Sequence, residues 1–338
     1  MPCKVVLVIF AKDTVSDERW QPLQSAIVMR LAGYLSGPVP AGPDFIQHRF
    51  LVPDRVLELS IMVGCPNVTL EQCTGFCLQS SGIMDLQQEY GVEVVAQPAE
   101  LYELHKSPGL AVFDMDSTLI QQEVIDELAR AVGLYDKVAA ITEAAMRGEA
   151  PYTDFEASLR ARVALLKGVQ TSIWEQLKAG TITFTPGARE LIQVLKRSGW
   201  KTAVLSGGFT PLANWVKETL GLDYAYANHL VSDSELNILT GELVPEAPII
   251  HAQRKRELLI QLARENDIPV ERTIAVGDGS NDLLMMGAAG LGVAFNAKPK
   301  VQQAAPARLN SSSLLDITHV LGYTKNEVDG ILAQAPRP

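Results

Sequence analysis

The stretch LAVFDMDST at residues 110–118 decides the fold class of this chain. Four apolar residues without polar alternation are followed at once by two aspartates. A strand that is apolar on both faces is typical of a parallel sheet covered by helices on both sides. Three more apolar runs follow at residues 202–205, 273–276 and 291–295, with helical patterns between them. The sequence therefore predicts an α/β fold with a doubly wound, mostly parallel sheet.

Polar residues directly follow three of these predicted strands. They are Asp114 and Asp116 after the first, Ser206-Gly207-Gly208 after the second, and GDGSND at residues 277–282 after the third. The carboxyl ends of parallel strands share one edge of an open sheet, and ligands bind in the crevice outside that edge. We therefore expect the three clusters to converge in one site. Their glycines allow a ligand to approach the backbone closely.

This predicted crevice concentrates negative charge. Its four carboxylates are those of Asp114, Asp116, Asp278 and Asp282. Left bare, such a cluster repels itself and raises its own pKa values. A hard divalent cation resolves the repulsion, and Mg²⁺ suits a site that combines few carboxylates with substrate phosphate and water. Lys255, in the opening turn of a predicted helix, offers the positive charge that a transferred phosphoryl group requires.

The remaining segments predict two additions to this core. The order βαββαβ over residues 1–100 suits a small antiparallel sheet with two helices on one face, and it is similar to the amino-acid-binding ACT-type module. Residues 121–185 carry helices and no convincing strand, which predicts a helical cap inserted after the first core strand. We expect an N-terminal ACT-like α+β module at 1–100, a core at 109–322, and a C-terminal helix and tail at 323–338.

The composition limits the partners of the chain. Its 338 residues are 47% apolar and 20% charged, which predicts a globular protein, and they carry a net charge of −10. A surface this acidic repels phosphate backbones and anionic lipids, so we expect no nucleic-acid and no membrane partner. A small anionic substrate needs only a local positive site or a metal ion. The four cysteines match no paired CxxC zinc pattern. Cys73 and Cys77, one helical turn apart, could reach a common metal but are predicted to be buried thiols. The chain is expected to be cytoplasmic.

The polar clusters together resemble the motifs of a known family. DMDST at residues 114–118 matches the DxDx[ST] signature of the haloacid dehalogenase-like phosphatases. LSGGF at residues 205–209 resembles their second motif, Lys255 their third, and GDGSND their fourth. The resemblance covers residues 109–321, and segments such as FDMDSTLIQQEVIDELA and VGDGSNDLLMMGAAGLGVAFNAKPKV are similar to the phosphoserine phosphatases within that family.

The resemblance implies a role for each matching residue. Asp114 would be the nucleophile that becomes an aspartyl phosphate, and Asp116 would be the general acid and then the general base. The implied Mg²⁺ ligands are Asp114, the main-chain carbonyl of Asp116, and Asp278, with Asp282 in support. The residues implied to hold or orient the phosphoryl group are Ser206, Gly207, Lys255 and Asn281.

Specificity is implied to come from the cap. Glu123 corresponds to the residue that faces the substrate ammonium, and Arg162 to the one that pairs with the substrate carboxylate. A guanidinium group binds a carboxylate through two parallel hydrogen bonds. Met146 and Phe155 match apolar residues that close over the substrate. The implied reaction is the Mg²⁺-dependent hydrolysis of O-phospho-L-serine to L-serine and phosphate, the last step of serine biosynthesis.

Two alternatives stay open from the sequence. The same fold could act on another small phosphomonoester such as phosphohomoserine, or transfer the phosphoryl group to a different alcohol. The N-terminal module could sense an amino acid, or mediate a homodimer. In every case the expected partner is a small-molecule substrate.

Overall fold

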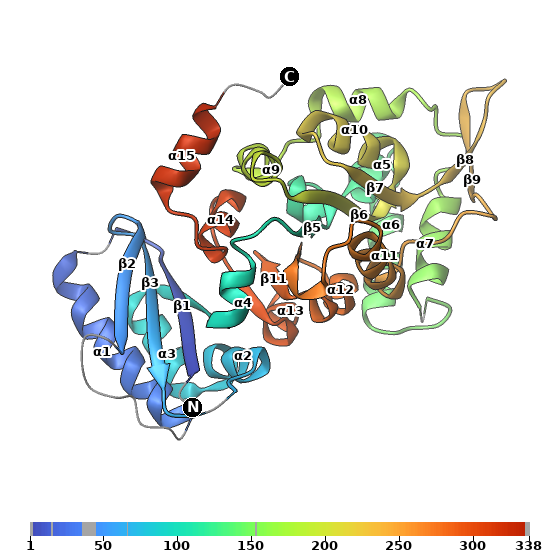
Figure 1. Cartoon of the computed structure of the whole chain (residues 1–338). Helices are drawn as coiled ribbons and strands as arrows, with labels where there is room; N and C mark the ends of the chain where they lie inside the picture. Colours follow the sequence, from blue (N-terminus) through green and yellow to red (C-terminus); the bar gives the residue numbers. More distant parts are fainter. Residues whose placement is uncertain (1–2, 15, 36–44, 66, 153, 335–338) are drawn as a thin grey trace.

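The computed structural model describes residues 3–14, 16–35, 45–65, 67–152 and 154–334, and it contains two main sheets (Figure 1). A four-stranded sheet lies in the N-terminal part, and a six-stranded sheet forms the centre of the larger part. Among the helices of the described residues, none combines the length and the apolar character that crossing a bilayer requires.

The N-terminal sheet is antiparallel throughout, in the order β2-β3-β1-β4. Its strands are β1 (Cys3–Ala11), β2 (Ile46–Val52), β3 (Val56–Val63) and β4 (Val92–Pro98). The helices that cover one face are α1 (Asp17–Tyr34), α2 (Leu70–Gln79) and α3 (Ser81–Tyr90). The predicted antiparallel sheet is therefore present, with helices on one face.

The sequence predicts a single helix over residues 70–83, and this expectation is wrong. The chain forms two helices there, because Ser80 has an extended backbone (φ −75°, ψ 117°) that interrupts the helical path. The Ser80 amide still donates to the Gly75 carbonyl, which ends α2, and α3 begins at the next residue. The apolar pattern continues across the break, so periodicity did not reveal it.

The core sheet is parallel throughout, in the order β12-β11-β10-β5-β6-β7. Its strands are β5 (Leu110–Phe113), β6 (Lys201–Phe209), β7 (Tyr224–Asn228), β10 (Thr273–Gly277), β11 (Leu291–Phe295) and β12 (Ala307–Leu309). The sequence missed β12, which has only three residues, and β7, whose YAYAN lacks an apolar run. The predicted doubly wound α/β fold is confirmed.

Helices cover both faces of this sheet, as the fully buried strands β5, β10 and β11 require. On one face, Leu110 and Val112 pack with α11 (Ala252–Glu265) and α12 (Leu283–Ala288). On the other, Ala111 and Phe113 pack with α9 (Ala188–Arg197) and α10 (Thr210–Leu220). The remaining helices of this part are α13 (Pro299–Ala304), α14 (Ile317–Val320) and α15 (Lys325–Ala333). Residues 335–338 of the predicted C-terminal tail lie outside the described residues.

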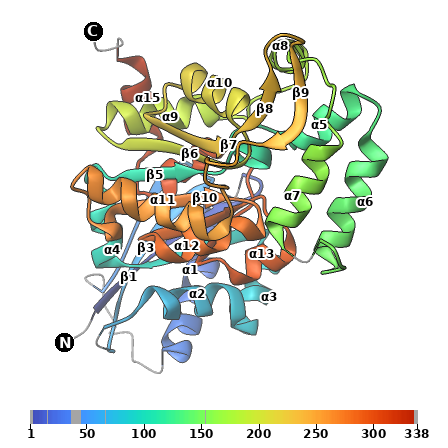
Figure 2. The ribbon, with the colours of Figure 1, turned by 90° about the vertical axis from the view of Figure 1, so that its right-hand side faces the viewer.

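The segment between β5 and α9 is helical. It contains α5 (Val124–Ala131), α6 (Tyr135–Met146), α7 (Phe155–Ala164) and α8 (Ile173–Gly180). Figure 2 shows α6 and α7 side by side at one end of the core. A hairpin of β8 (Leu230–Asp233) and β9 (Ile238–Leu243) is tied to the link between α7 and α8. The Gly168 amide donates to the Leu239 carbonyl at 2.8 Å, and the Leu239 amide donates to the Val169 carbonyl at 2.8 Å.

The second face of the N-terminal sheet is buried against the core and α4 (Ala99–Leu104). Val6, Val8 and Phe10 share one hydrophobic cluster with core residues, whereas the alternate residues of β1 face the N-terminal helices. Because side chains alternate along a strand, this sheet carries apolar residues on both faces. The N-terminal sheet is therefore joined to the core by a buried apolar layer.

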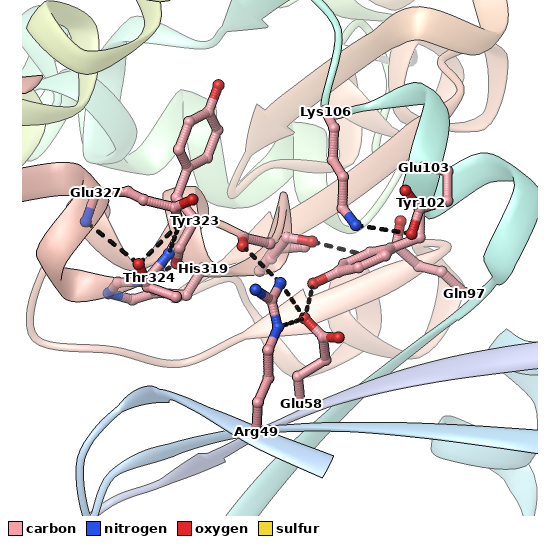
Figure 3. Close-up of polar contacts among 12 residues, drawn as sticks. Arg49, Glu58, Gln97, Tyr102, Glu103, Lys106, His319, Tyr323, Thr324 and Glu327 are labelled. Atoms are coloured by element: carbon pink, nitrogen blue, oxygen red, sulfur yellow. Dashed lines mark hydrogen bonds and ion pairs between the residues drawn. The ribbon is translucent and has the colours of Figure 1, made fainter. Parts of the chain in front are cut away.

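Polar contacts at the margin of this layer centre on Glu58 (Figure 3). Its Oε2 accepts hydrogen bonds from Arg49 Nη2 and from the Tyr102 hydroxyl, both at 2.6 Å. Arg49 Nη2 also donates to the carbonyl of Gly322 at 3.2 Å, and Gln97 Nε2 donates to the carbonyl of Val320 at 3.0 Å. Burial and the charge of Glu58 raise the pKa of Tyr102. The Glu58 carboxylate thus joins three separate segments of the chain.

We expect Glu58→Ala to lower the free energy of unfolding by about 2 kcal/mol, because the buried Tyr102 hydroxyl would lose its acceptor and Arg49 its partner. Chemical denaturation with urea measures the change. Glu103→Ala is the matched control, since Glu103 belongs to an exposed pair with Lys106 in the same region and should change stability by less than about 1 kcal/mol. Equal effects of the two substitutions would contradict a stabilising role for the Glu58 contacts.

Candidate active site

The chain turns sharply where β5 ends, and this turn presents two aspartates. The Asp114 amide donates to the Val276 carbonyl at 2.9 Å, so the turn starts in register with β10. Residues Met115–Leu119 then form a tight turn in which Ser117 has φ +54°, a left-handed value that is uncommon outside glycine. The amide of Val124, at the start of the cap, donates to Asp116 Oδ2 at 3.2 Å. The turn therefore connects the core strand to the cap through Asp116.

Lys255 lies at the centre of the site. Its Nζ donates to Asp114 Oδ1 and to Asp282 Oδ1, each at 2.7 Å, and its side chain has no exposed surface. Burial opposes the charge of Lys255, but the carboxylates of Asp114 and Asp282 outweigh this effect and raise the pKa of the ammonium group. A fully buried lysine with two carboxylate partners stays charged and holds both partners in place.

Three aspartates meet above this lysine. Asp114, Asp278 and Asp282 each offer a carboxylate oxygen, and these oxygens all lie within 4.8 Å of one another. Burial and the charge of Asp114 raise the pKa of Asp278 to about 8 and that of Asp282 to about 7. The expectation that Asp114 and Asp278 gather at one edge of the sheet agrees with this geometry. Three buried carboxylates that repel one another provide the oxygen ligands that a hard divalent cation such as Mg²⁺ prefers.

Asp116 lies outside this group and has a different environment. Its Oδ1 is buried and has no hydrogen-bond partner among the described residues. Burial, followed by the charges of Glu123 and Asp114, raises the pKa of Asp116 well above its ordinary value. The environment therefore favours the protonated form of this side chain, and none of the described residues forms a hydrogen bond with Oδ1. This arrangement suits a general acid.

Two glycines of the site lie close to other side chains. A Cβ at Gly277 would lie 2.4 Å from Asp282 Oδ2, so a larger residue would displace that carboxylate. A Cβ at Gly207 would lie 3.2 Å from the ring of Phe155 and 3.8 Å from Asn281 Nδ2. Ser206 is buried, and its Oγ accepts from the Gly208 amide at 2.8 Å. Gly207 therefore lies between the cap and the fourth motif.

These groups line a cavity of about 900 Å³ between the core and the cap. The predicted site residues that line it are Asp114, Asp116, Glu123, Phe155, Arg162, Ser206, Gly207, Asp278 and Asn281. Lys255 and Asp282 lie behind its wall. Lys255 contacts Asp114 directly, and Asp282 is connected to Asp114 through Lys255. Met146 ends α6, and its side chain lies outside the described residues. The structure thus brings together predicted site residues that are up to 168 positions apart, from Asp114 to Asp282.

The cap side of the cavity carries one negative and one positive group. Glu123 Oε1 accepts from the Ser117 hydroxyl at 2.9 Å, and enclosure in the cavity together with nearby Asp114 raises the pKa of Glu123. Arg162 uses its Nε to donate to the Ser158 carbonyl at 3.2 Å. Its two terminal nitrogens make no hydrogen bond with the described residues. They are available to a carboxylate in the cavity.

Sequence reasoning missed part of the cavity wall. The segment Lys298, Pro299, Lys300 and Val301 lines it, as do Ile125 and Leu159 from the cap. The four-residue segment follows β11, so it lies at the same strand edge that identified the other clusters. Extending that rule to the fourth predicted strand, at residues 291–295, would have found it.

Comparison with known proteins places the chain in a family. A profile of the family described as haloacid dehalogenase-like hydrolase matches residues 111–287, more than half of the chain. The chain belongs to the haloacid dehalogenase-like hydrolases. It is 54% identical over 212 residues to the phosphoserine phosphatase of Idiomarina loihiensis, which covers 62% of this chain and 92% of that protein.

Solved structures support the same placement. A haloacid dehalogenase family hydrolase of Salmonella enterica serovar Typhi is 28% identical, with a TM-score of 0.74 over 94% of this chain and 98% of that one. A phosphoserine phosphatase solved as a phospho-aspartyl intermediate analogue is 41% identical, with a TM-score of 0.57 over 63% of this chain and 99% of that one. The predicted family is confirmed, and the chain is a phosphatase similar to phosphoserine phosphatases.

We expect Mg²⁺ to bind more tightly as the pH rises through about 7 to 8, because the carboxylates must lose protons to bind the ion. The raised pKa values of Asp278 and Asp282 set this interval. Isothermal titration calorimetry in buffers with different ionisation enthalpies measures both the affinity and the protons released. Binding without proton release at pH 7 would contradict the assignment.

The raised pKa values of Asp278 and Asp282 also predict how the stability of the metal-free protein depends on pH. The folded state holds these protons more tightly than the unfolded chain, whose aspartates lose them near pH 4, so metal-free stability falls as the pH rises from about 4 to about 8 and levels off above that. Thermal unfolding at several pH values measures this slope. Asp278→Asn removes the titrating group with the pKa of about 8 and should flatten the slope, and an unchanged slope would contradict the burial of charge at this position.

Proposed function

We propose that this chain hydrolyses O-phospho-L-serine to L-serine and inorganic phosphate through a phosphate ester of Asp114. The observation that carries the proposal is the pairing of two aspartates with different environments. Asp114 is held by the Lys255 ammonium group, and Asp116 lies two residues away with an unpartnered oxygen and a raised pKa that favours its protonated form. The environment of Asp114 suits a nucleophile, and that of Asp116 suits a proton donor. The phospho-aspartyl analogue solved for a relative supports this chemistry.

The first half of the reaction transfers the phosphoryl group to the protein. A carboxylate oxygen of Asp114 attacks phosphorus, and the bond from phosphorus to the serine oxygen breaks. The leaving oxygen takes the proton from Asp116, so serine departs as a neutral alcohol. Lys255, Ser206 and the Gly207 amide would stabilise the charge on the phosphoryl oxygens.

The second half restores Asp114. Asp116, now ionised, takes a proton from water as the water oxygen attacks phosphorus. The bond between phosphorus and the Asp114 oxygen breaks, which releases phosphate and regenerates both aspartates in their initial protonation states. Asp114, Asp278 and Asp282, together with the Asp116 carbonyl, would hold Mg²⁺. The bound ion would neutralise the negative charge of the transferred phosphoryl group.

The cap supplies the proposed specificity for an amino acid. Glu123 offers a carboxylate for the substrate ammonium, and the terminal nitrogens of Arg162 offer a fork for the substrate carboxylate. Phe155 lies against Gly207 and closes the cavity above the phosphoryl group, and Met146 is proposed to act beside it. Opposite charges on the cap therefore match the two charges of a zwitterion, and the carboxylates on the core match the metal and phosphate.

The organisation of the chain is part of this proposal. We propose an ACT-like module at residues 1–100, a catalytic core at 109–322 with its cap at about 121–185, and a C-terminal helix and tail at 323–338. Cytoplasmic location and a homodimer through the N-terminal module stay predictions. The four cysteines carry free thiols, which suits a reducing compartment.

The direct test is phosphate release from O-phospho-L-serine with and without Mg²⁺. We expect turnover that requires the metal and exceeds turnover of phosphohomoserine and glycerol phosphate. Asp114→Asn should abolish it, because an amide cannot form the phosphate ester. Equal rates across the substrates would contradict the serine assignment, and an active Asp114→Asn variant would contradict the nucleophile.

Arg162→Lys tests the carboxylate site. We expect kcat/KM for O-phospho-L-serine to fall by about 10- to 100-fold, because a lysine cannot form the two parallel hydrogen bonds. Turnover of O-phosphoethanolamine, which lacks the carboxylate, should change little. Arg160→Lys is the matched control, since Arg160 lies on the same helix but pairs with Glu156 at the surface. A similar loss with both substrates would contradict the assignment.

A further inference from the structure

Lys298 is a charged residue of the cavity wall that the catalytic scheme does not use. It lies between β11 and α13, and its carbonyl accepts from the amides of Val301 and Gln302 at 2.9 and 3.0 Å. These hydrogen bonds fix its backbone at the start of the helix. The residue is exposed and lines the cavity. Its ammonium group makes no ion pair and no hydrogen bond within the described part of the chain.

The charge of Lys298 acts on both sides of the cavity. It opposes the rise in the pKa of Glu123, which belongs to the cap side, and of Asp278, which belongs to the core. Lys298 lines the same cavity as both of these carboxylates, and it is exposed, which places it where the cavity opens to solvent.

The charges of the site indicate a role for the Lys298 ammonium group. The chain carries a net charge of −10, and Asp114, Glu123 and Asp278 are among the acidic residues that line the cavity. The Lys255 ammonium group is committed to Asp114 and Asp282. Arg162 belongs to α7, where it faces the substrate carboxylate in the proposed function. The positive charge left for an incoming phosphate dianion is therefore that of the two exposed lysines of the wall, Lys298 and its neighbour Lys300.

We propose that Lys298 is a positioning residue that binds the phosphate group of the substrate at the mouth of the cavity and guides it past Glu123 toward Asp114. This inference rests on the proposed function. Lys298 touches no reacting atom, so it contributes to capture of the dianion and not to the transfer step. Its contribution is electrostatic, and it should be screened by salt.

The test compares Lys298→Gln and Lys298→Arg with the wild-type chain. We expect Lys298→Gln to raise KM for O-phospho-L-serine by about 5- to 10-fold, with kcat within about two-fold, because one solvent-exposed charge contact to the phosphate is lost. The fall of kcat/KM between low and high ionic strength should be less steep in this variant. Lys298→Arg, which keeps the charge, should restore both quantities.

Lys137→Gln is the matched control, because Lys137 is an exposed lysine of α6 that does not line the cavity. It removes the same charge from the chain and should leave KM and the salt dependence unchanged. If Lys298→Gln changes neither quantity beyond the control, the proposal is wrong. A loss in kcat at constant KM would also overturn it, since that result places Lys298 in the transfer step.

A second measurement separates this proposal from the proposed function. Inorganic phosphate, titrated calorimetrically into the Mg²⁺-loaded protein, reports on anion capture without turnover. If the wild-type chain does not hydrolyse O-phospho-L-serine, the proposed function fails, but weaker phosphate binding by Lys298→Gln still supports the anion site. If the wild-type chain hydrolyses it and phosphate binds both proteins equally, only the role of Lys298 fails.

Discussion

The contact of one buried ammonium group with two carboxylates organises the whole site. Lys255 is fully buried, and it lies 2.7 Å from both Asp114 and Asp282. One positive charge does not balance a cluster that also contains Asp278, so the metal-free site retains protons, as the raised pKa values of Asp278 and Asp282 record. The metal-free site favours the protonated forms of Asp278 and Asp282, and these two residues become ligands when a cation replaces their protons. The same lysine orients the nucleophile and limits the repulsion around it.

The core holds the groups for phosphoryl transfer and the cap holds the groups for substrate recognition, because the two parts are built differently. The core presents its aspartates from strand ends that are fixed by a parallel sheet with helices on both faces. The cap presents Glu123 and Arg162 from helices, and it is tied to the core by the backbone hydrogen bonds between Leu239 and residues 168–169. Groups that need exact geometry for transfer are therefore held by the sheet. Groups that recognise the rest of the substrate are held by an element that sequence changes can alter without disturbing the sheet.

Much of this arrangement was predictable, because sheet topology alone brings strand ends together. Asp114 and Asp278 are separated by more than 160 residues, yet both follow apolar strands, and this was sufficient to expect one cluster. The environment of Asp116 was not predictable. Its unpartnered oxygen and its raised pKa depend on burial by the cap and on the charge of Glu123, which no local pattern encodes. The break at Ser80 was missed for the related reason that apolar periodicity continues through it.

The wall that carries Lys298 also connects the cavity to the N-terminal sheet. From Lys298 the chain runs through α13 into β12, and the neighbouring Pro306 carbonyl accepts from the Thr74 hydroxyl at 2.6 Å. Just after β12, the amide of Asn310 donates to Glu93 Oε2 at 2.6 Å. Because Thr74 belongs to α2 and Glu93 to β4, two elements of the N-terminal sheet layer hold both ends of β12. The N-terminal layer is therefore connected to the cavity wall through β12 and α13, along a route that does not pass through the cap.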